Sequence, residues 1–573
     1  MTGAETPIPR KVWWASVCLL FVLGVAPYWQ GRSFAFVYDD HGQIVDNAFL
    51  TSEQRWADLF SLRTLSDPTL INGRRPLTLL SHLLDRTWWG LNPIGWHLTN
   101  YLLHALNGIL LFTLLIRLSR YAPASRPHPS AVFLAALCVV WHPAMVEAVQ
   151  VPAFRPDLIV VFFLLMTLHT VFPAATGRSL GTAFRLALAS FSALAAVLAK
   201  ESGVIALASV WLMWWIFPRT RGSLRQMMGW SGVTLLLIAG FWGLCMRVGA
   251  DAAVPSSWQA LGAEWNGRSL LPPTNFLTMP WLWAHYLWLL VCPVGLLVDH
   301  VVPPVTQLMD FRLWIGLAVG LLTVAFWWRT DREQVWRRFG LGLTLLGFAP
   351  VSNLVPLLNP VAERYMPPMV LGFAIWLMLG WQGQGHVRRW MWGRIIYLTL
   401  LLVWTILRVP VFASDHTLWH QTVKDQPRSA RAHTWVGLLA RQAGDVDRAL
   451  HHYQQAQQLN PYDLTPLINQ ALIHGQRGEL AEAARLMEQA LAIRPSFPPV
   501  HATLAMIRYQ QGDGVAALAH LDEALRLDPY HLPARRLRIQ LHRQTGHWSA
   551  VRTDAEWLRE RYPDDPLLRG LPP

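Results

Sequence analysis

The sequence predicts an all-α protein, in which a polytopic bundle of membrane helices is followed by an α-solenoid. Two observations lead to this fold class. Of the 573 residues, 53% are hydrophobic and only 14% are charged, whereas an ordinary soluble protein has about a quarter charged residues. The C-terminal part is instead polar, and its Pro and Gly residues recur with a period of 34 residues.

Eleven apolar runs predict transmembrane helices, because a backbone can cross lipid only with its own hydrogen bonds satisfied. The 31 tryptophans fit anchoring at the two membrane interfaces. A twelfth run, 277–298, contains His285, Cys292 and Pro293, and we expect it to be re-entrant or to lie in the membrane plane. The eleven runs are 12–29, 97–117, 130–148, 157–174, 183–199, 203–218, 228–246, 311–328, 338–357, 365–381 and 392–412.

The arginines predict the orientation of the bundle. The net charge of +13 arises largely in short loops between apolar runs, which fits the positive-inside rule better than a nucleic-acid surface. The N-terminus is then cytoplasmic, and the first apolar run is an uncleaved anchor. The loops 30–96, 142–157, 200–202, 247–310 and 350–364 and everything after 412 are extracytoplasmic. Compact loops without retention signals favour a bacterial inner membrane over the endoplasmic reticulum.

The C-terminal period is typical of tetratricopeptide repeats, which are helix–turn–helix units of 34 residues with small residues where the helices cross. We predict about four repeats in 430–573, a linker helix in 413–429 and a membrane domain in 1–412. The concave face of such an array binds extended peptides or partner helices, and a rigid spacer or dimerisation arm is the alternative. The phased residues are Pro427, Pro461, Pro495, Pro529 and Pro563, with Gly444, Gly478, Gly512 and Gly546.

Ionisable residues gather at the predicted extracytoplasmic ends of the spans. Because charges at a membrane boundary are costly, such residues indicate a functional site. Each of these residues, taken alone, could have a structural role, as His142 could by capping a helix. Their common position on the extracytoplasmic face is what favours one polar site. The first loop contributes Asp39, Asp40, Arg74 and Arg75, and later junctions add His142, Glu147, Arg155, Asp157, Lys200, Glu201, Asp299, His300, Glu363 and Arg364.

Several stretches together resemble one known family. They are "FVYDDHGQIVDN", "RRPLTLLSHLLDRTWWGLNPIGWHLTNYLLHALN", "HPAMVEAV" with "FRPDL", "LAKESGV" and "ERYMPP", followed by the repeats. In this order they resemble the transmembrane and tetratricopeptide-repeat O-mannosyltransferases, within the C-type glycosyltransferase superfamily. The resemblance covers nearly the whole chain, and the acidic pair of the first loop is among its more specific parts.

The resemblance implies an inverting glycosyltransferase that moves a sugar, mannose in this family, from a polyprenyl-phosphate donor to a hydroxyl of a protein acceptor. It implies Asp39 as the base that activates the acceptor, with Asp40 orienting it or binding sugar. The leaving phosphate needs cations. A divalent metal is possible but not favoured, because the two acids are adjacent rather than spaced. The phosphate-binding candidates are Arg364, Lys200 and Arg155, and the sugar-binding candidates are His142, Glu147, Asp157, Glu201, Glu363 and Arg75.

Three other functions stay open. A noncatalytic membrane-anchored scaffold for envelope assembly would use the repeats alone and would not need Asp39. A saccharide ligase would share the donor but not the protein acceptor that we expect the repeats to bind. A transporter would place charges near mid-membrane and show internal symmetry, and neither is seen. The sequence has no phosphate-binding Gly-rich loop, zinc-ligand spacing or nucleophile elbow, which argues against an enzyme that uses cytosolic nucleotides.

Overall fold

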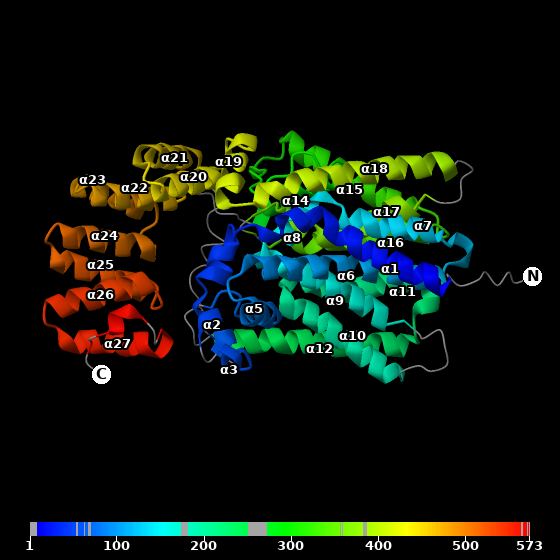
Figure 1. Cartoon of the computed structure of the whole chain (residues 1–573), viewed down its shortest axis with the longest axis horizontal. Helices are drawn as coiled ribbons and strands as arrows, with labels where there is room; N and C mark the ends of the chain where they lie inside the picture. The colour runs from blue at the N-terminus through cyan, green and yellow to red at the C-terminus, as the bar shows by residue number, and fades with distance from the viewer. Residues whose placement is uncertain are drawn as a thin grey trace, which may run out of the picture. The chain divides into compact units, whose positions relative to one another are not determined.

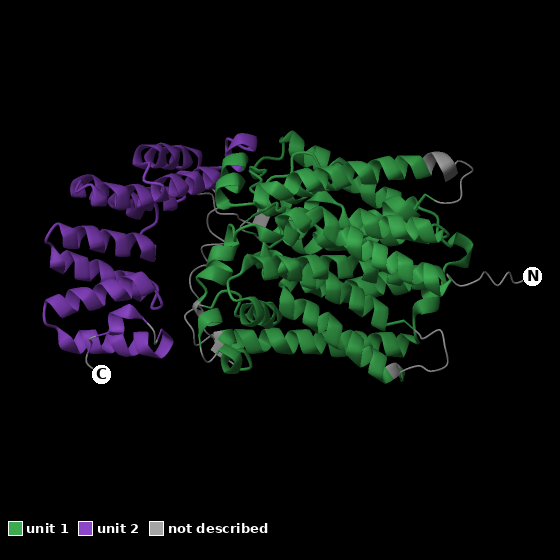
Figure 2. Cartoon of the chain, in the orientation of Figure 1, with its two compact units in different colours: residues 1–253, 270–421 green, residues 254–269, 422–573 purple. Residues whose placement is uncertain are grey.

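The computed structural model describes residues 9–571 apart from 53–54, 62, 67–69, 173–180, 250–271, 356, 358, 382–386, 563–564 and 570. Throughout these residues the regular secondary structure is helical, which confirms the all-α prediction (Figure 1). The chain divides into two compact units, residues 1–253 with 270–421 and residues 254–269 with 422–573 (Figure 2). The predicted boundaries at 412/413 and 429/430 stay predictions, and the division between the units falls within α19 (Asp415–Asp425).

Unit 1 is a membrane helix bundle in which every predicted apolar run overlaps at least one helix. Among the residues that the structure describes, six helices are long and apolar enough to cross a bilayer, or seven if α7 and α8, bent by 48°, form one span. The count of eleven stays a prediction, because α10, α11 and α17 are apolar but short. The helices are α1 (Arg10–Val25), α6 (Pro93–Ser119), α7 (Pro129–Val140), α8 (Val146–Gln150), α9 (Arg155–Thr170), α10 (Thr182–Ala199), α11 (Ile205–Ile216), α12 (Leu224–Gly249), α14 (Pro272–Val291), α15 (Phe311–Arg329), α16 (Val335–Phe348), α17 (Pro367–Leu379) and α18 (Val387–Arg408).

The spanning helices differ in how much of their surface other helices cover. The spans that contain α6 and α9 are 56% and 72% buried, whereas those that contain α1, α12, α15 and α18 are 17–28% buried. Large apolar side chains such as Leu236, Leu321 and Leu322 are exposed on the less buried helices. An apolar surface of this extent needs lipid to cover it. The chain is therefore a membrane protein, with α6 and α9 at the centre of its bundle.

A polar stripe on α6 satisfies carbonyl groups near the breaks in neighbouring helices. Asn100, His104 and Asn107 follow each other at helical spacing and are fully buried. Asn100 Nδ2 donates to the Val149 carbonyl at 3.1 Å and His104 Nε2 to the Val140 carbonyl at 3.2 Å. Asn107 Nδ2 donates to the Leu158 carbonyl at 3.0 Å. Since no water is available in the hydrocarbon, the bonds to Val140 and Val149 let α7 and α8 end inside the bundle, and the bond to Leu158 joins α6 to the first turn of α9.

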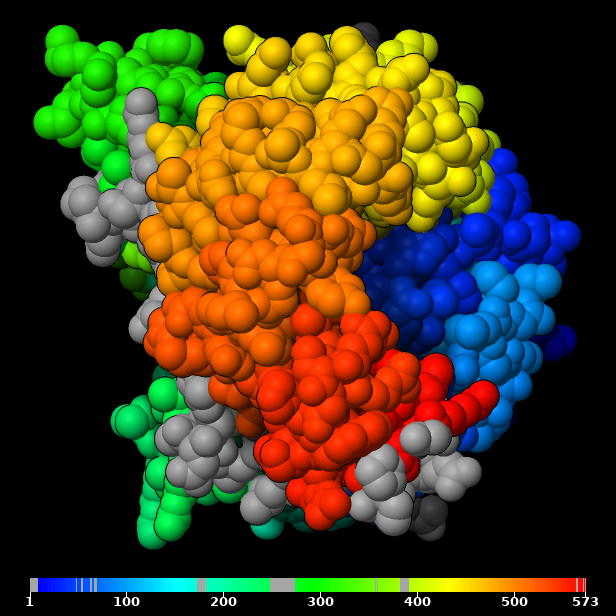
Figure 3. Space-filling model, turned by 90° about the vertical axis from the view of Figure 1, so that its left-hand side faces the viewer, coloured from blue at the N-terminus to red at the C-terminus, as the bar shows by residue number. Residues whose placement is uncertain are grey.

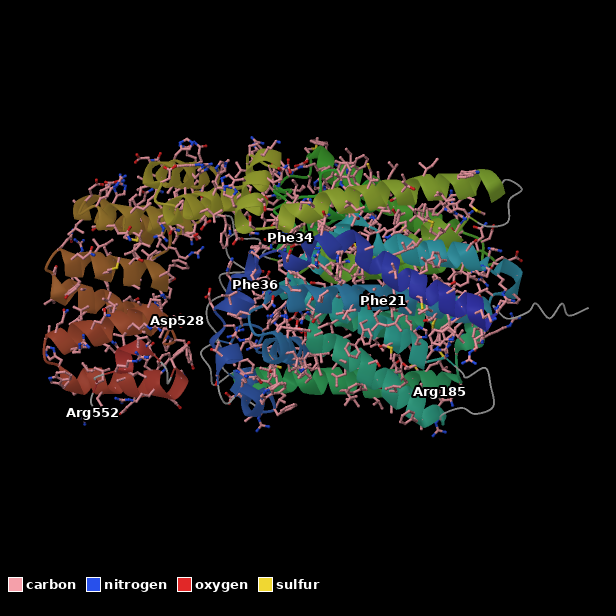
Figure 4. All side chains as sticks on the ribbon, viewed as in Figure 1. Phe21, Phe34, Phe36, Arg185, Asp528 and Arg552 are labelled. Atoms are coloured by element: carbon pink, nitrogen blue, oxygen red, sulfur yellow. The ribbon has the colours of Figure 1, made fainter. Side chains whose placement is uncertain are left out.

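The first loop, 30–96, folds into a small helical layer with its own apolar core at one end of the bundle. In Figure 4 its residues Phe34 and Phe36 lie at this end, while Arg185 lies at the other. The core contains Phe36, Ile44, Phe49 and Leu50 of the early loop. This packing holds the acidic pair on an ordered scaffold. The regular elements of the loop are a π-helical turn (His41–Val45), α2 (Ala48–Thr51), α3 (Arg55–Leu59), α4 (Arg63–Ser66) and α5 (Pro76–Trp89).

Unit 2 is an array of four helix pairs, as the 34-residue period predicts. The helices α20 to α27 are labelled in Figure 1, and the surface that they form turns from orange to red along the chain in Figure 3. Gly444, Gly478, Gly512 and Gly546 end the first helix of each pair at φ between 76° and 85°, where only glycine is unstrained. Pro563 lies outside the described residues. The pairs are α20 (Ala430–Gln442) with α21 (Val446–Leu459), α22 (Thr465–Gln476) with α23 (Leu480–Ile493), α24 (Pro498–Gln510) with α25 (Gly514–Leu527) and α26 (Leu532–Gln544) with α27 (Trp548–Arg561).

One position of the repeat contains a matched pair of side chains, one from each helix. In the first and third repeats the pair is His–His, with Nδ1 to Nδ1 distances of 3.0 Å for His433–His452 and 3.2 Å for His501–His520. In the fourth repeat Arg535 donates to Asp554 at 2.6 Å. In the second repeat the pair is Leu467 and Leu486, two members of one apolar cluster. In each repeat a polar member of the pair faces a polar partner, and an apolar member faces an apolar one.

Candidate active site

The two acids of the first loop have different environments. Asp40 is fully buried, and its two carboxylate oxygens accept backbone hydrogen bonds from Ala153 N at 2.7 Å and Val37 N at 3.1 Å. Burial raises the pKa of Asp40 to about 7, although both hydrogen bonds act in the opposite direction. Asp39 is half-buried and accepts from Gln43 Nε2 at 3.5 Å. Asp40 thus joins the first loop to the segment before α9, while Asp39 keeps exposed surface.

The backbone that carries the acids is held in a strained conformation. Tyr38 has φ 57°, in the left-handed region that is unfavourable for an aromatic residue. Its amide donates to Asp415 Oδ1 at 2.9 Å, and the other oxygen of that carboxylate lies 2.6 Å from His41 Nε2. The Tyr38 ring packs against Phe154 and Trp419 at centroid distances of 5.7 and 5.2 Å. The strain of about 1–3 kcal/mol that such a residue stores fixes the direction of the following Asp39.

The "ERY" tripeptide before α17 is held by two buried ion pairs. Glu147 accepts from Arg364 Nη1 at 2.8 Å and from the Arg364 backbone N at 2.7 Å. Glu363 accepts from Arg408 Nη2 at 2.5 and 2.7 Å, and its carboxylate lies 3.7 Å from His300 Nε2. Both carboxylates are fully buried. Glu147 and Glu363 therefore position Arg364 and Arg408, and neither presents an open surface to a sugar.

Two further ion pairs adjoin this tripeptide. Lys200 Nζ donates to both oxygens of Asp157 at 2.6 and 2.8 Å. Arg75 forms a bidentate pair with Glu201 at 3.0 and 2.8 Å, and both of these side chains are part-exposed. Burial lowers the pKa of Lys200, while the Asp157 carboxylate beside it acts in the opposite direction. Each predicted cation therefore already has one carboxylate partner.

Tyr365 and Phe154 connect the pairs. Lys200 Nζ lies 4.9 Å and the Arg364 guanidinium 5.2 Å from the Tyr365 ring, on which both cations therefore converge. Arg364 also stacks over Phe154 at 4.3 Å. Asp39 is near enough to act electrostatically on Arg364. We call this set the junction cluster: Asp39, Arg75, Glu147, Asp157, Lys200, Glu201, Arg364 and Tyr365.

Arg155 and His142 have structural roles instead of the predicted binding roles. The guanidinium of Arg155 is 1% exposed. Its Nε donates to Asn100 at 2.6 Å, and its Nη atoms donate to Asp85, Ser81 and the Trp96 carbonyl. All five N–H groups are thereby occupied, and none remains for a phosphate. His142 Nδ1 accepts from Ala144 N and its Nε2 donates to the Leu290 carbonyl, so this residue is a helix cap, the alternative considered above.

The structure adds residues that the sequence interpretation missed. Tyr38 and Tyr365 adjoin predicted residues, and their position next to Asp39 and Arg364 was the only available signal. Arg408 ends an apolar run, and Asp415 begins the predicted linker helix. No local pattern links either of them to the first loop or to "ERY". Among the described residues no group of three or more His, Cys, Asp or Glu side chains converges as metal ligands would.

The arrangement offers the parts of a displacement reaction at a charged leaving group. A part-exposed carboxylate, Asp39, lies near cations that share one aromatic platform. A carboxylate can remove a proton from a hydroxyl, and Lys and Arg can stabilise a phosphate. These groups stand at one end of the bundle, where a substrate with a lipid tail could reach them from the membrane.

Comparisons with known proteins confirm the predicted resemblance. The tetratricopeptide repeat family model matches residues 416–463 and 468–531. Protein O-mannosyl-transferase TMTC4 of Mus musculus is 26% identical over 73% of this chain and 63% of its own length. TMTC3 of Homo sapiens is 25% identical over 84% of this chain and 55% of its own. TMTC2 of Mus musculus is 32% identical over 58% of this chain and 38% of its own. The chain therefore spans about two thirds or less of the length of these relatives.

Among solved structures, ArnT from Cupriavidus metallidurans bound to undecaprenyl phosphate aligns over 90% of this chain and 78% of its own. The sequence identity is 12% and the TM-score is 0.40, which is too low to establish a shared fold.

Proposed function

We propose that the chain is an integral-membrane inverting glycosyltransferase. It transfers a sugar from a polyprenyl-phosphate donor to a hydroxyl group of a protein, and the names of its relatives favour mannose. The observation that carries the proposal is the junction cluster, which combines a part-exposed carboxylate, Asp39, with the cations Arg364 and Lys200. The likeness to protein O-mannosyl-transferases supports the same reaction class.

In the proposed reaction Asp39 removes the proton of the acceptor hydroxyl as its oxygen attacks the anomeric carbon of the sugar. The bond between that carbon and the phosphate oxygen breaks on the opposite face, so a single displacement inverts the anomeric centre. General-base assistance of this kind contributes roughly 10²–10⁴ in rate. The polyprenyl phosphate leaves with an added negative charge, which Arg364 and Lys200 stabilise. No metal is required in this scheme.

The remaining predicted residues act in two ways. Asp40, Glu147 and Glu363 are buried, and we assign them the positioning of Asp39, Arg364 and the "ERY" tripeptide. Arg75 and Glu201 are part-exposed, and with Asp157 they are our candidates for contacts to sugar hydroxyls.

The repeats supply the acceptor side of the proposal. Tetratricopeptide arrays bind extended peptides, and an extended segment presents its Ser and Thr hydroxyls without prior unfolding. We place the first loop and the repeats on the extracytoplasmic side, because the arginine-rich loops require it under the positive-inside rule.

The test is transfer of labelled mannose from polyprenyl-phosphate mannose to envelope proteins in membranes that contain the whole chain. We expect Asp39→Asn to lose at least 100-fold of the transfer rate at matched expression. Asp46→Asn is the matched control, since Asp46 is an exposed acid of the same loop, and it should retain activity. Equal transfer by Asp39→Asn and wild type would exclude Asp39 as the base. If neither the wild type nor the variants transfer a sugar from any polyprenyl-phosphate donor, the result would favour a noncatalytic scaffold.

A further inference from the structure

A cavity of about 1010 Å³ opens in unit 1 at the end away from the junction cluster. Helix α11 separates the two sites, since Lys200 and the short turn Glu201–Val204 precede it and Trp215 lies in its last turn. The cavity is formed where the loop after α6, the end of α11 and the turn between α15 and α16 meet. We call it the arginine cavity. Its charged lining residues are Arg219, Arg329, Arg332 and Arg338, with Asp331 and Glu333.

The arginines of this cavity differ from the cations of the junction cluster because they have no carboxylate partners. Among the described residues none of the four forms an ion pair with Asp331, Glu333 or another acid. Arg338 Nη2 donates only to the Trp328 carbonyl, at 3.2 Å. The buried Nε of Arg338 has no hydrogen-bond partner in the described part of the chain. Four cations and two acids line the same hollow, which therefore has a net positive charge.

Exposed tryptophans place the cavity at the level of lipid headgroups. Trp215 and Trp328 line it and are 51% and 71% exposed. Arg338 lies 5.7 Å from the ring centroid of Trp215. In membrane proteins, exposed tryptophans concentrate at the boundary between headgroups and hydrocarbon. The lipid-covered faces of α11 and α15 begin next to these rings, so acyl chains have an apolar surface beside the charged hollow.

We propose that the arginine cavity binds the phosphodiester headgroup of an anionic membrane lipid. Guanidinium groups match phosphate oxygens in charge and in fork geometry, and basic pockets between membrane helices suit such headgroups. The arginines hold the phosphate, and Trp215 and Trp328 border the glycerol backbone and the first carbons of the chains. This site is separate from the proposed transfer reaction and does not depend on it.

The test uses the whole chain, purified in a neutral detergent and titrated with palmitoyl-oleoyl phosphatidylglycerol or phosphatidylcholine. Lipid binding is followed by native mass spectrometry. The variant is Arg219→Gln/Arg332→Gln, because both side chains are exposed and its folding should be unaffected. Two fewer arginines should weaken phosphatidylglycerol binding about 30-fold. Arg120→Gln/Arg225→Gln is the matched control, since it removes the same charge from exposed arginines at the end of α6 and the start of α12, which do not line the cavity.

The proposal is supported if wild type and the control prefer phosphatidylglycerol to phosphatidylcholine while the cavity variant has lost that preference. Equal binding of the two lipids by wild type would overturn it. An equal loss in both double variants would also overturn it, because the attraction would then belong to the whole arginine-rich surface. Glycerol 3-phosphate is added at the same concentration as the lipid. If it displaces phosphatidylglycerol, the cavity binds a soluble phosphate compound and the lipid proposal is overturned. Arg338→Gln, which keeps the exposed charges, should also weaken binding.

Discussion

Two neighbouring residues of the same type, Asp39 and Asp40, illustrate how local environment divides their roles. Asp40 has no exposed surface and both of its oxygens accept backbone N–H groups, so it stabilises the loop. Asp39 keeps exposed surface and is near enough to Arg364 to act on it electrostatically. The sequence predicted the pair but could not separate its members, because the partner of Asp40, Ala153 N, lies more than a hundred residues away. A base must reach solvent or substrate, which favours Asp39.

The environment of Asp40 predicts a pH dependence of stability. Burial raises its pKa to about 7 in the folded state, above the ordinary value of about 3.9. The raised pKa of Asp40 contributes to the free energy of unfolding. This contribution is fully present below the ordinary pKa and is lost as the pH rises through 7. The thermal midpoint of the wild type should therefore fall between about pH 4 and pH 7 and level off above that.

The variant Asp40→Asn should remove this fall. The amide oxygen can replace one acceptor but not both, so the variant is less stable than wild type at pH 6 by about 1–3 kcal/mol. The difference should shrink as the pH rises, because the Asn side chain does not titrate. Unfolding followed by tryptophan fluorescence in detergent measures both midpoints. Asp46→Asn should keep the wild-type slope, and an unchanged slope in Asp40→Asn would assign the effect to other groups.

Arg155 shows why residue type alone was an incomplete guide. A buried arginine beside a predicted site looks like a phosphate ligand, but Asn100, Ser81 and Asp85 occupy its donors. Those partners come from α5 and α6, and only tertiary packing brings them to the start of α9. Arg155 joins α5, α6 and α9. Without it, the buried Asp85 would lose its cationic partner, which would cost several kcal/mol.

At the scale of elements, the helices could be predicted better than their breaks. Lipid requires a helix wherever a long apolar run crosses it, and each predicted run overlaps at least one helix. The run 130–148 was expected to be continuous, whereas α7 ends at Val140 and α8 begins at Val146. Pro143 is the local reason, since it lacks an N–H and His142 caps the new start. The stabilising α6 stripe could not be assigned in advance, because its acceptors are backbone carbonyls.

The matched pairs of the repeats predict strong coupling between two positions. His501→Arg alone places a cation against His520, which has no carboxylate to offer. His501→Arg/His520→Asp reproduces the Arg535–Asp554 pair of the fourth repeat. The single variant should lose about 1–3 kcal/mol of local stability, and the second substitution should restore most of it.

Hydrogen exchange of the α24 and α25 amides in the whole chain measures this coupling. His451→Arg is the matched control, since His451 is exposed on α21, and it should leave protection unchanged. If the effects of the two substitutions on protection are additive, residues 501 and 520 are independent of each other, and the prediction is wrong.

At the scale of the whole molecule, the sequence interpretation of a membrane bundle followed by a repeat array is confirmed. Composition decides the first part and the 34-residue period decides the second, and neither depends on long-range contacts. The site required more, because Arg408 and Asp415 come from segments that were expected to be a span end and a linker. Their carboxylate and guanidinium groups fix Tyr38 and Glu363 from outside the motifs that carry the resemblance.

Orientation in the membrane is the prediction that belongs to the whole molecule. The arginine-rich loops should be cytoplasmic, so the first loop and the repeats should share the extracytoplasmic side. An alkaline phosphatase fused after residue 573 should be active, and a β-galactosidase at the same point inactive. The reverse pattern would place the junction cluster and the repeats on opposite sides or invert the bundle.

The matched pairs also constrain how the repeat array can change during evolution. A crossover in the turn at Gly444 or Gly478 would join a helix with His433 to a helix with Leu486 and leave a ring nitrogen facing a methyl group. A crossover near Pro461 or Pro495, between repeats, transfers both members together. Duplications and deletions can therefore preserve stability only in whole 34-residue units that begin at these prolines, so the heritable module is the pair and not the single helix.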